Sequence, residues 1–101
     1  MSKLFEISVV RIGTPGATPC DRSTVLGNPF VMRHESERDS VCDEYERYFS
    51  NKIASQDPVY LNELRKLYKL GKQQGYLKLG CHCAPKRCHA DTIANFLQRY
   101  T

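Results

Sequence analysis

The sequence predicts a small α/β domain with a short parallel or mixed sheet. Segments typical of buried strands stand at residues 4–12 and 76–81, toward opposite ends of the chain. Two stretches with a helical spacing of apolar residues lie between them, and a third follows the second strand. Helices between strands favour parallel pairing, because the chain must cross over before it returns in the same direction. With 101 residues, 41% of them hydrophobic, the chain forms one α/β domain over residues 1–101 with a modest core.

The first strand, residues 4–12, is rich in β-branched residues and ends at Gly13. Residues 13–27 then lack periodicity and are interrupted by proline and glycine, which is typical of a long functional or mobile loop. Because two strands make a poor sheet, a short third strand is expected near residues 30–32.

Start and stop signals bound the helices. Ser36, Glu37, Arg38 and Asp39 resemble a capping box before a stripe formed by Val41, Tyr45, Tyr48 and Phe49. The pair Asp57–Pro58 predicts a second start, with the aspartate as N-cap, and Gly71 or Gly75 would end that helix. Its apolar face consists of Leu61, Leu64, Leu67 and Tyr68, and that of the last helix of Ile93, Phe96, Leu97 and Tyr100.

Composition limits the class of protein. The formal charge of +4 and the pI near 8.9 are mildly basic, and no run of like charges forms a nucleic-acid-binding arm. A partner that carries phosphate remains open. No segment is apolar enough to span a membrane, and the N-terminus lacks the apolar region of a signal peptide. Five cysteines, an odd number, favour thiols, a metal site or catalysis in an intracellular protein over a disulfide framework.

Three of the five cysteines and two of the three histidines fall within residues 81–89, which we call the Cys/His loop. This loop follows the predicted strand 76–81 and precedes a helix, which is where α/β folds collect ligands. Zinc is one interpretation, although the ligands lack the usual paired CxxC spacing; its ligand set would be Cys81, Cys83, Cys88 and His89. An anion site at the helix start, beside Lys86 and Arg87, is another.

Two further interpretations of the Cys/His loop stay open. Cys81 and Arg87 have the C-x5-R spacing of cysteine phosphatases, in which a loop cradles phosphate over a thiolate at a helix N-terminus. Alternatively, small buried thiols simply pack the corner between strand and helix, with His89 as a cap. Cys20 and Cys42 are read as ordinary thiols, and His34 as a surface histidine.

A second motif, GNPF, occupies residues 27–30. Its composition is that of a tight turn, and Phe30 then docks in the core. In a functional interpretation, the Asn28 amide and the loop backbone face a ligand, with Arg33 and His34 nearby. Both motifs follow strand-like segments, and the carboxyl ends of parallel strands share one edge of a sheet. We therefore expect Asn28 and Cys81 to face each other across one cleft.

The two motifs together carry a resemblance. The chain resembles the family called domain of unknown function 4326, small bacterial and phage proteins marked by GNPF and a later GCxC-x-P-x-x-CH. The second motif stands here at residues 80–89, and the similarity runs from about residue 12 to residue 97. The resemblance implies a small Rossmann-like, three-layer domain whose two motifs face one pocket, as in families that bind nucleotides or nucleotide sugars.

The resulting functional hypothesis is a phosphorylated, nucleotide-like ligand bound between the two motifs, in the cytoplasm or in the host cytoplasm if a phage encodes the chain. The expected binding residues are Gly27, Asn28, Pro29, Phe30, Arg33, Lys86, Arg87 and Cys88. In a hydrolase or transferase, Cys81 or Cys83 is the nucleophile or a neighbour of the oxyanion. His89 is then the general acid and base, and Asp91 orients it. The alternative is a non-enzymatic phage accessory protein that binds a host protein or nucleic acid, with zinc in the Cys/His loop.

Overall fold

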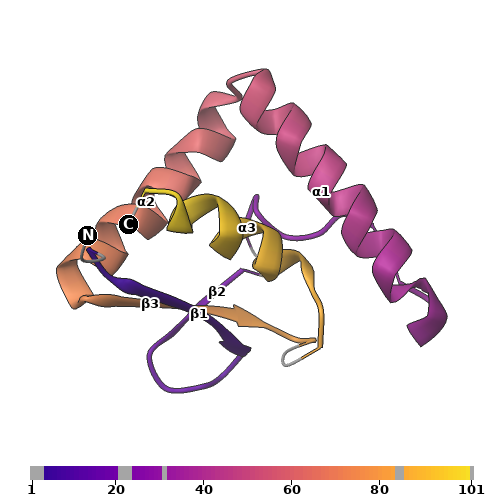
Figure 1. The fold of residues 1–101 in the computed structure, drawn as a ribbon, viewed down its shortest axis with the longest axis horizontal. Helices are drawn as coiled ribbons and strands as arrows, with labels where there is room; N and C mark the ends of the chain where they lie inside the picture. The colour runs from indigo at the N-terminus through magenta and orange to yellow at the C-terminus, as the bar shows by residue number, and fades with distance from the viewer. Residues whose placement is uncertain (1–3, 21–23, 31, 84–85, 101) are drawn as a thin grey trace.

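The computed structural model describes residues 4–20, 24–30, 32–83 and 86–100 (Figure 1). Along the chain, the elements are the strands β1 (Glu6–Arg11) and β2 (Ala17–Pro19), the 3-10 helix η1 (Glu35–Glu37), the helices α1 (Arg38–Ala54) and α2 (Pro58–Gln74), the strand β3 (Tyr76–Cys81) and the helix α3 (His89–Gln98). Within these ranges, no helix is long and apolar enough to cross a membrane. The α/β class predicted from the sequence is confirmed.

The sheet has three strands in the order β1-β3-β2, and both outer strands run parallel to β3. Leu79 of β3 lies opposite Val9 on one side and Thr18 on the other. The last residue of β3, Cys81, pairs with Arg11. The strand that carries the Cys/His loop is therefore the centre of the sheet, and its carboxyl end opens at the sheet edge.

The third strand lies at Ala17–Pro19, inside the stretch that the sequence predicts as a long loop. Phe30 and Met32, at the ends of the predicted strand 30–32, lie outside any strand, and Val31 is outside the described residues. The prediction missed β2 because three residues are too few to show alternation. Proline is tolerated at its end because β2 is an edge strand, where a missing N–H breaks no second ladder.

The first strand is shorter and less buried than predicted. It covers Glu6–Arg11, and Ile7 and Val9 are only partly buried against the core. Its position at the sheet edge explains this exposure, because an edge strand has a neighbour on one side alone.

The second helix follows its sequence signals closely. The side chain of Asp57 accepts hydrogen bonds from the backbone N–H groups of Val59 and Tyr60, both at 3.1 Å, and Pro58 is the first helical residue. The helix ends at Gly75, whose φ of 82° is the left-handed conformation that glycine adopts without strain.

The first helix begins differently from the prediction. The short helix η1 precedes it, and the capping carboxylate belongs to Glu37, which accepts from the N–H groups of Arg33 and His34 at 3.0 Å. The predicted apolar stripe is nevertheless real, since Tyr45 and Phe49 are buried.

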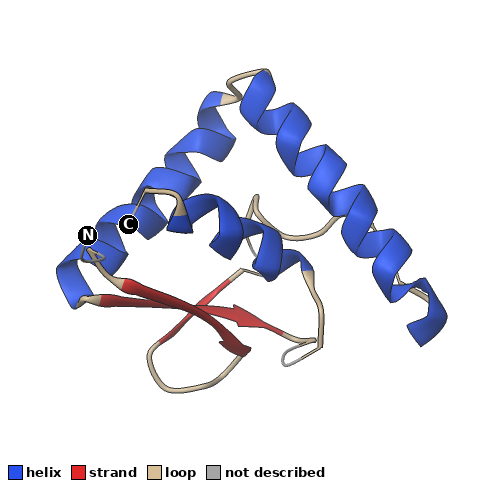
Figure 2. Ribbon diagram, in the orientation of Figure 1, coloured by secondary structure: helices blue, strands red, loops and turns tan. Residues whose placement is uncertain are grey.

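The helices gather on one side of the sheet in Figure 2. Leu77, Leu79 and Cys81 of β3 are almost completely buried and belong to the core under the helices. On the opposite face, a Cβ built on Gly80 would lie 3.4 Å from Ile12 Cα, so the connection between β1 and β2 passes there. A Rossmann-like arrangement of three layers is therefore not confirmed.

Candidate functional site

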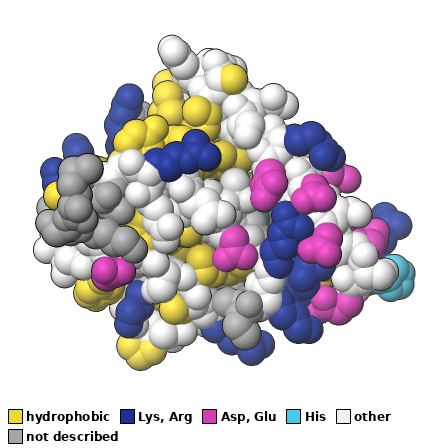
Figure 3. Space-filling model, in the orientation of Figure 1, with side chains coloured by type: hydrophobic (Ala, Val, Ile, Leu, Met, Phe, Trp, Pro, Cys, Tyr) yellow, Lys and Arg dark blue, Asp and Glu magenta, His cyan; other side chains and the backbone are white. Residues whose placement is uncertain are grey.

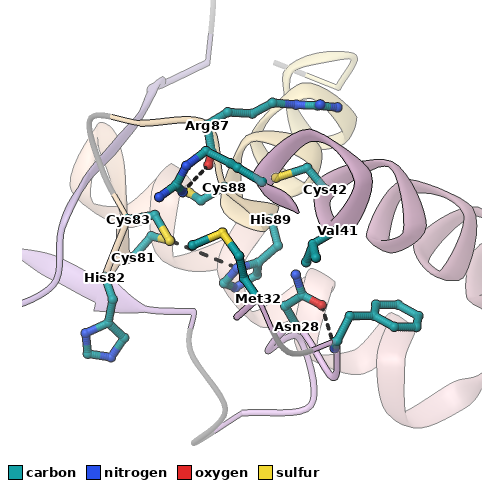
Figure 4. Close-up of a pocket in the computed structure, with 12 residues that line it drawn as sticks. Asn28, Met32, Val41, Cys42, Cys81, His82, Cys83, Arg87, Cys88 and His89 are labelled. Atoms are coloured by element: carbon teal, nitrogen blue, oxygen red, sulfur yellow. Dashed lines mark hydrogen bonds between the residues drawn. The ribbon is translucent and has the colours of Figure 1, made fainter. Parts of the chain in front are cut away.

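A cavity of about 340 Å³ lies between the GNPF loop, the start of α1 and the Cys/His loop (Figure 4). Asn28 and Phe30 contribute from the GNPF loop, and Val41 and Cys42 from α1. The Cys/His loop contributes Cys81, Cys83, Cys88 and His89. Asn28 and Cys81 thus face one cavity, which confirms the expectation that the two motifs share a cleft.

The GNPF loop is a turn and a cavity wall at the same time. Asn28 Oδ1 accepts a hydrogen bond of 2.9 Å from the Phe30 N–H, which closes the turn, while the nitrogen end of its amide points toward the cavity (Figure 4). The Phe30 ring packs edge-on against Tyr48, with centroids 5.9 Å apart. Just before the motif, Tyr45 donates a hydrogen bond of 2.7 Å to the Leu26 carbonyl, so α1 fixes the position of the loop.

Cys81 ends β3 at the floor of the cavity, with 1% of its surface exposed. Its sulfur accepts hydrogen bonds from the Cys88 thiol, the His89 ring and the backbone N–H of Cys83. Together with the positive charge of His89, these bonds lower the pKa of Cys81 to about 4, although burial acts in the opposite direction. Because Cys88 donates its proton to this sulfur, its own pKa is raised, and burial adds to the effect.

His89 is held by both ring nitrogens. Nε2 donates a hydrogen bond to the backbone carbonyl of Cys20, and Nδ1 lies 4.0 Å from the Cys81 sulfur. A carbonyl only accepts, so Nε2 carries a proton and Nδ1 is the ring nitrogen that faces the Cys81 sulfur. The ring also packs edge-on against Tyr45, at 5.2 Å between centroids.

The orienting group of His89 is therefore the Cys20 carbonyl, whereas the sequence analysis assigned this role to Asp91. Asp91 Oδ2 accepts a hydrogen bond of 3.1 Å from the Cys88 N–H and caps helix α3. No side-chain pattern could have indicated Cys20, because the functional group is its backbone carbonyl.

The cations predicted to bind an anion are engaged in ion pairs with acidic residues. Lys86 Nζ lies 3.0 Å from Glu35. The Arg87 guanidinium lies within 3.3 Å of carboxylate oxygens of Asp39, Asp43 and Glu46 on α1. Basic and acidic side chains alternate on this side of the molecule in Figure 3. The Arg87 side chain leads away from Cys81 and Cys83 in Figure 4, unlike the arginine of a phosphatase loop.

Arg38, which the sequence analysis treated only as part of a capping box, lines the cavity. Its guanidinium forms two hydrogen bonds with Glu35, at 2.6 and 2.8 Å, and donates to the Arg87 carbonyl at 2.9 Å. A hydrogen bond with the Cys83 sulfur turns it toward the thiols, and these interactions, the Glu35 bonds foremost, raise its pKa. An arginine at a helix start gives no sequence signal for such a role.

The predicted site residues fall into two groups, those that line the cavity and those that do not. The cavity wall includes Asn28, Phe30, Cys81, Cys83, Arg87, Cys88 and His89. Gly27, Pro29, Arg33, Lys86 and Asp91 lie outside it. In the part of the chain that the structure describes, no group of three or more His, Cys, Asp or Glu is placed to hold a metal ion. The predicted zinc set of Cys81, Cys83, Cys88 and His89 therefore gains no support from the geometry.

Fold and cavity define a small parallel α/β domain with a thiol-rich pocket at the carboxyl end of its central strand. The family described as domain of unknown function (DUF4326) has a model that matches residues 10–99. The chain belongs to the DUF4326 family, as its two motifs predicted. No curated protein and no solved structure matches it.

Proposed function

We propose that the cavity binds a phosphorylated, nucleotide-like ligand and that Cys81 acts on it as a nucleophile in a hydrolase or transferase reaction. The observation that carries the proposal is the buried Cys81 sulfur at the floor of a cavity, with His89 Nδ1 4.0 Å away and donors around it that lower its pKa. Packing alone requires no such arrangement. Perturbed titratable groups in a cleft are typical of functional sites.

The shape and position of the cavity suit a small ligand. Its volume of about 340 Å³ lies at the lower end of the range for ligand pockets. It opens beyond the carboxyl end of β3, where ligands bind in parallel sheets.

The lining favours an anion with an apolar part. Two arginines, Arg38 and Arg87, belong to the described wall, which contains no Asp or Glu. Arg38 is the better candidate for a phosphate, because it pairs with the single carboxylate of Glu35, whereas Arg87 is held by three carboxylates. Phe30, Met32 and Val41 give the cavity an apolar side on which a base or sugar can rest.

The proposed reaction uses two side chains. The Cys81 thiolate attacks the electrophilic atom of the ligand, and the leaving group takes a proton from Nδ1 of protonated His89. Water or an acceptor hydroxyl then displaces the Cys81 sulfur, and Nδ1 takes the proton back. The Cys20 carbonyl stabilises the protonated ring through Nε2. Cys81 is a more suitable nucleophile than Cys83, because the Cys81 sulfur lies 4.0 Å from His89 Nδ1.

We place this activity in the cytoplasm, of the host where a phage encodes the chain. The five cysteines are free, and free thiols persist in a reducing compartment.

The test is a thermal-shift and turnover screen of nucleotides, nucleosides and nucleotide sugars. A ligand that raises the melting temperature should lose this effect with Arg38→Met, and Cys81→Ser should abolish turnover while binding remains. Cys42→Ser is the matched control, because Cys42 lines the same cavity but burial raises the pKa of its thiol. If no compound in the panel shifts the protein, the proposal fails. Binding of a host protein or nucleic acid then becomes the hypothesis to pursue.

A further inference from the structure

Four of the five cysteines line one cavity, namely Cys42, Cys81, Cys83 and Cys88, and all carry free thiols. A nucleophilic mechanism needs only one of them. Figure 4 shows that three of these side chains, from the Cys/His loop, gather at the same end of the cavity. What the additional sulfurs do is therefore a separate question.

Cys81 and Cys88 line the same end of the cavity (Figure 4). The Cys88 thiol donates a hydrogen bond to the Cys81 sulfur. Both backbones are fixed, since Cys81 pairs with Arg11 in the sheet and Cys88 is the N-cap of α3, where its sulfur accepts from the Ala90 N–H. A disulfide requires two sulfurs that can meet with little backbone movement, and these two side chains project into the same end of one cavity from fixed backbones (Figure 4).

The other thiols of the cavity are less suited to pair with Cys81. Cys83 is two residues away in the chain, and its sulfur interacts with the Arg38 guanidinium. Cys42 belongs to helix α1, on another wall of the cavity.

We propose that Cys81 and Cys88 form a redox pair, in which Cys81 reacts with a hydroperoxide and Cys88 closes an intramolecular disulfide. The inference concerns regulation of the proposed site and rests on Cys81 being its nucleophile, because the disulfide removes that sulfur from reaction. A hydroperoxide is small enough to reach Cys81 through the cavity, although little of the residue is exposed.

Both steps balance. The Cys81 sulfur attacks one peroxide oxygen, the O–O bond breaks, and the alcohol or water leaves with a proton from His89, which produces a sulfenic acid on Cys81. The Cys88 sulfur then attacks the Cys81 sulfur, the S–O bond breaks, and the oxygen leaves as water with the Cys88 proton. The two thiols lose two electrons and the peroxide gains them. A reducing dithiol returns the pair to its starting state.

The chain is well suited to a peptide-mapping test. Trypsin cleaves after Lys78, Lys86 and Arg87, so one peptide carries Cys81 and Cys83, and another begins at Cys88. The reduced protein is treated with dilute hydrogen peroxide, digested and weighed. We expect a loss of two of the five free thiols and a covalent link between these two peptides, which dithiothreitol reverses.

Variants identify the linked sulfurs. Cys83→Ser should keep the link, and Cys81→Ser should abolish it. Cys88→Ser should stop at a sulfenic acid on Cys81 that a cyclic 1,3-diketone traps. Cys42→Ser is the matched control and should behave like the parent.

The inference is overturned if the link survives in Cys81→Ser, if it disappears in Cys83→Ser, or if peroxide consumes the Cys42 thiol as fast as Cys81. Should Cys88→Ser fail to fold, the parent map and Cys83→Ser still decide. The nucleotide panel is measured on reduced protein, so the two results are independent. If the protein binds a nucleotide but forms no link, only the redox inference is refuted. If it forms the link but binds no nucleotide, only the proposed ligand is refuted.

Discussion

Tyr45 is the residue through which the GNPF loop, helix α2 and His89 meet, and its hydroxyl can be removed without changing the shape of the ring. The hydroxyl donates to the Leu26 carbonyl at 2.7 Å and lies 2.9 Å from the Tyr60 hydroxyl. Since Tyr45 has one proton and gives it to Leu26, Tyr60 must donate in the second bond. Tyr45→Phe therefore leaves a carbonyl without its donor and a hydroxyl without its acceptor.

The carbonyl and the hydroxyl that lose their partners are both buried, because Leu26 and Tyr60 are each 2% exposed. A buried polar group that loses its partner costs about 1–3 kcal/mol, so we expect Tyr45→Phe to lower the free energy of unfolding by about 2 kcal/mol. For a domain of this size, that corresponds to a drop of about 8–16 °C in melting temperature. Tyr60→Phe should cost about half as much, because Tyr45 still donates to Leu26.

The assay is urea unfolding followed by tyrosine fluorescence and circular dichroism, with thermal melting as a second measurement. Tyr48→Phe is the control: the described part of the chain gives its hydroxyl no hydrogen bond, and its loss should stay below about 0.5 kcal/mol. If Tyr45→Phe costs no more than Tyr48→Phe, the hydroxyl does not hold the GNPF loop in place. The hydrogen bond between Tyr45 and Leu26 then does not fix the cavity wall.

Two further results are expected. The ultraviolet absorbance of a thiolate should appear as the pH rises through about 4 and be absent in Cys81→Ser, because the hydrogen bond from Cys88 and the other donors lower the pKa of Cys81. Since this folded pKa lies below that of an ordinary thiol, the Cys81 thiolate stabilises the folded protein, and this stabilisation is lost as pH falls through about 4. An absorbance step only near pH 9 would contradict the geometry. Gly71→Ala should destabilise the protein, because a Cβ there would lie 2.4 Å from the Phe5 ring. The overpacking costs about 1–3 kcal/mol and outweighs the gain of about 1 kcal/mol in helix propensity. If urea unfolding shows equal or higher stability for this variant, the Phe5 ring moves aside at little cost.

The elements that sequence analysis located well are those whose signals are local. Asp57, Pro58 and Gly75 bound helix α2 through their own backbone chemistry, and the strand at Tyr76–Cys81 is apolar enough to stand out. The meeting of Asn28 and Cys81 at one cavity also followed, because parallel strands bring their carboxyl ends to the same edge.

What could not be predicted depends on distant partners. Strand β2 exists because β3 offers it an unpaired edge, and its three residues have no pattern of their own. Arg87 points toward α1 because acidic residues more than forty positions earlier lie beside it. Arg38 and the Cys20 carbonyl belong to the site for the same reason, since each gains its role from a contact with the Cys/His loop.

The strand order has a consequence for how the protein is made. Because β1 and β2 each pair with β3 and not with each other, the ribosome releases both outer strands before their shared partner is synthesised. A nascent chain that ends before Tyr76 contains β1 and β2 but lacks the strand with which both pair. The Cys20 carbonyl likewise gains its contact with His89 only after that later residue is synthesised. The sheet and the site therefore form together, once the segment from Tyr76 to His89 has been synthesised, and a chain that stops before this segment has neither.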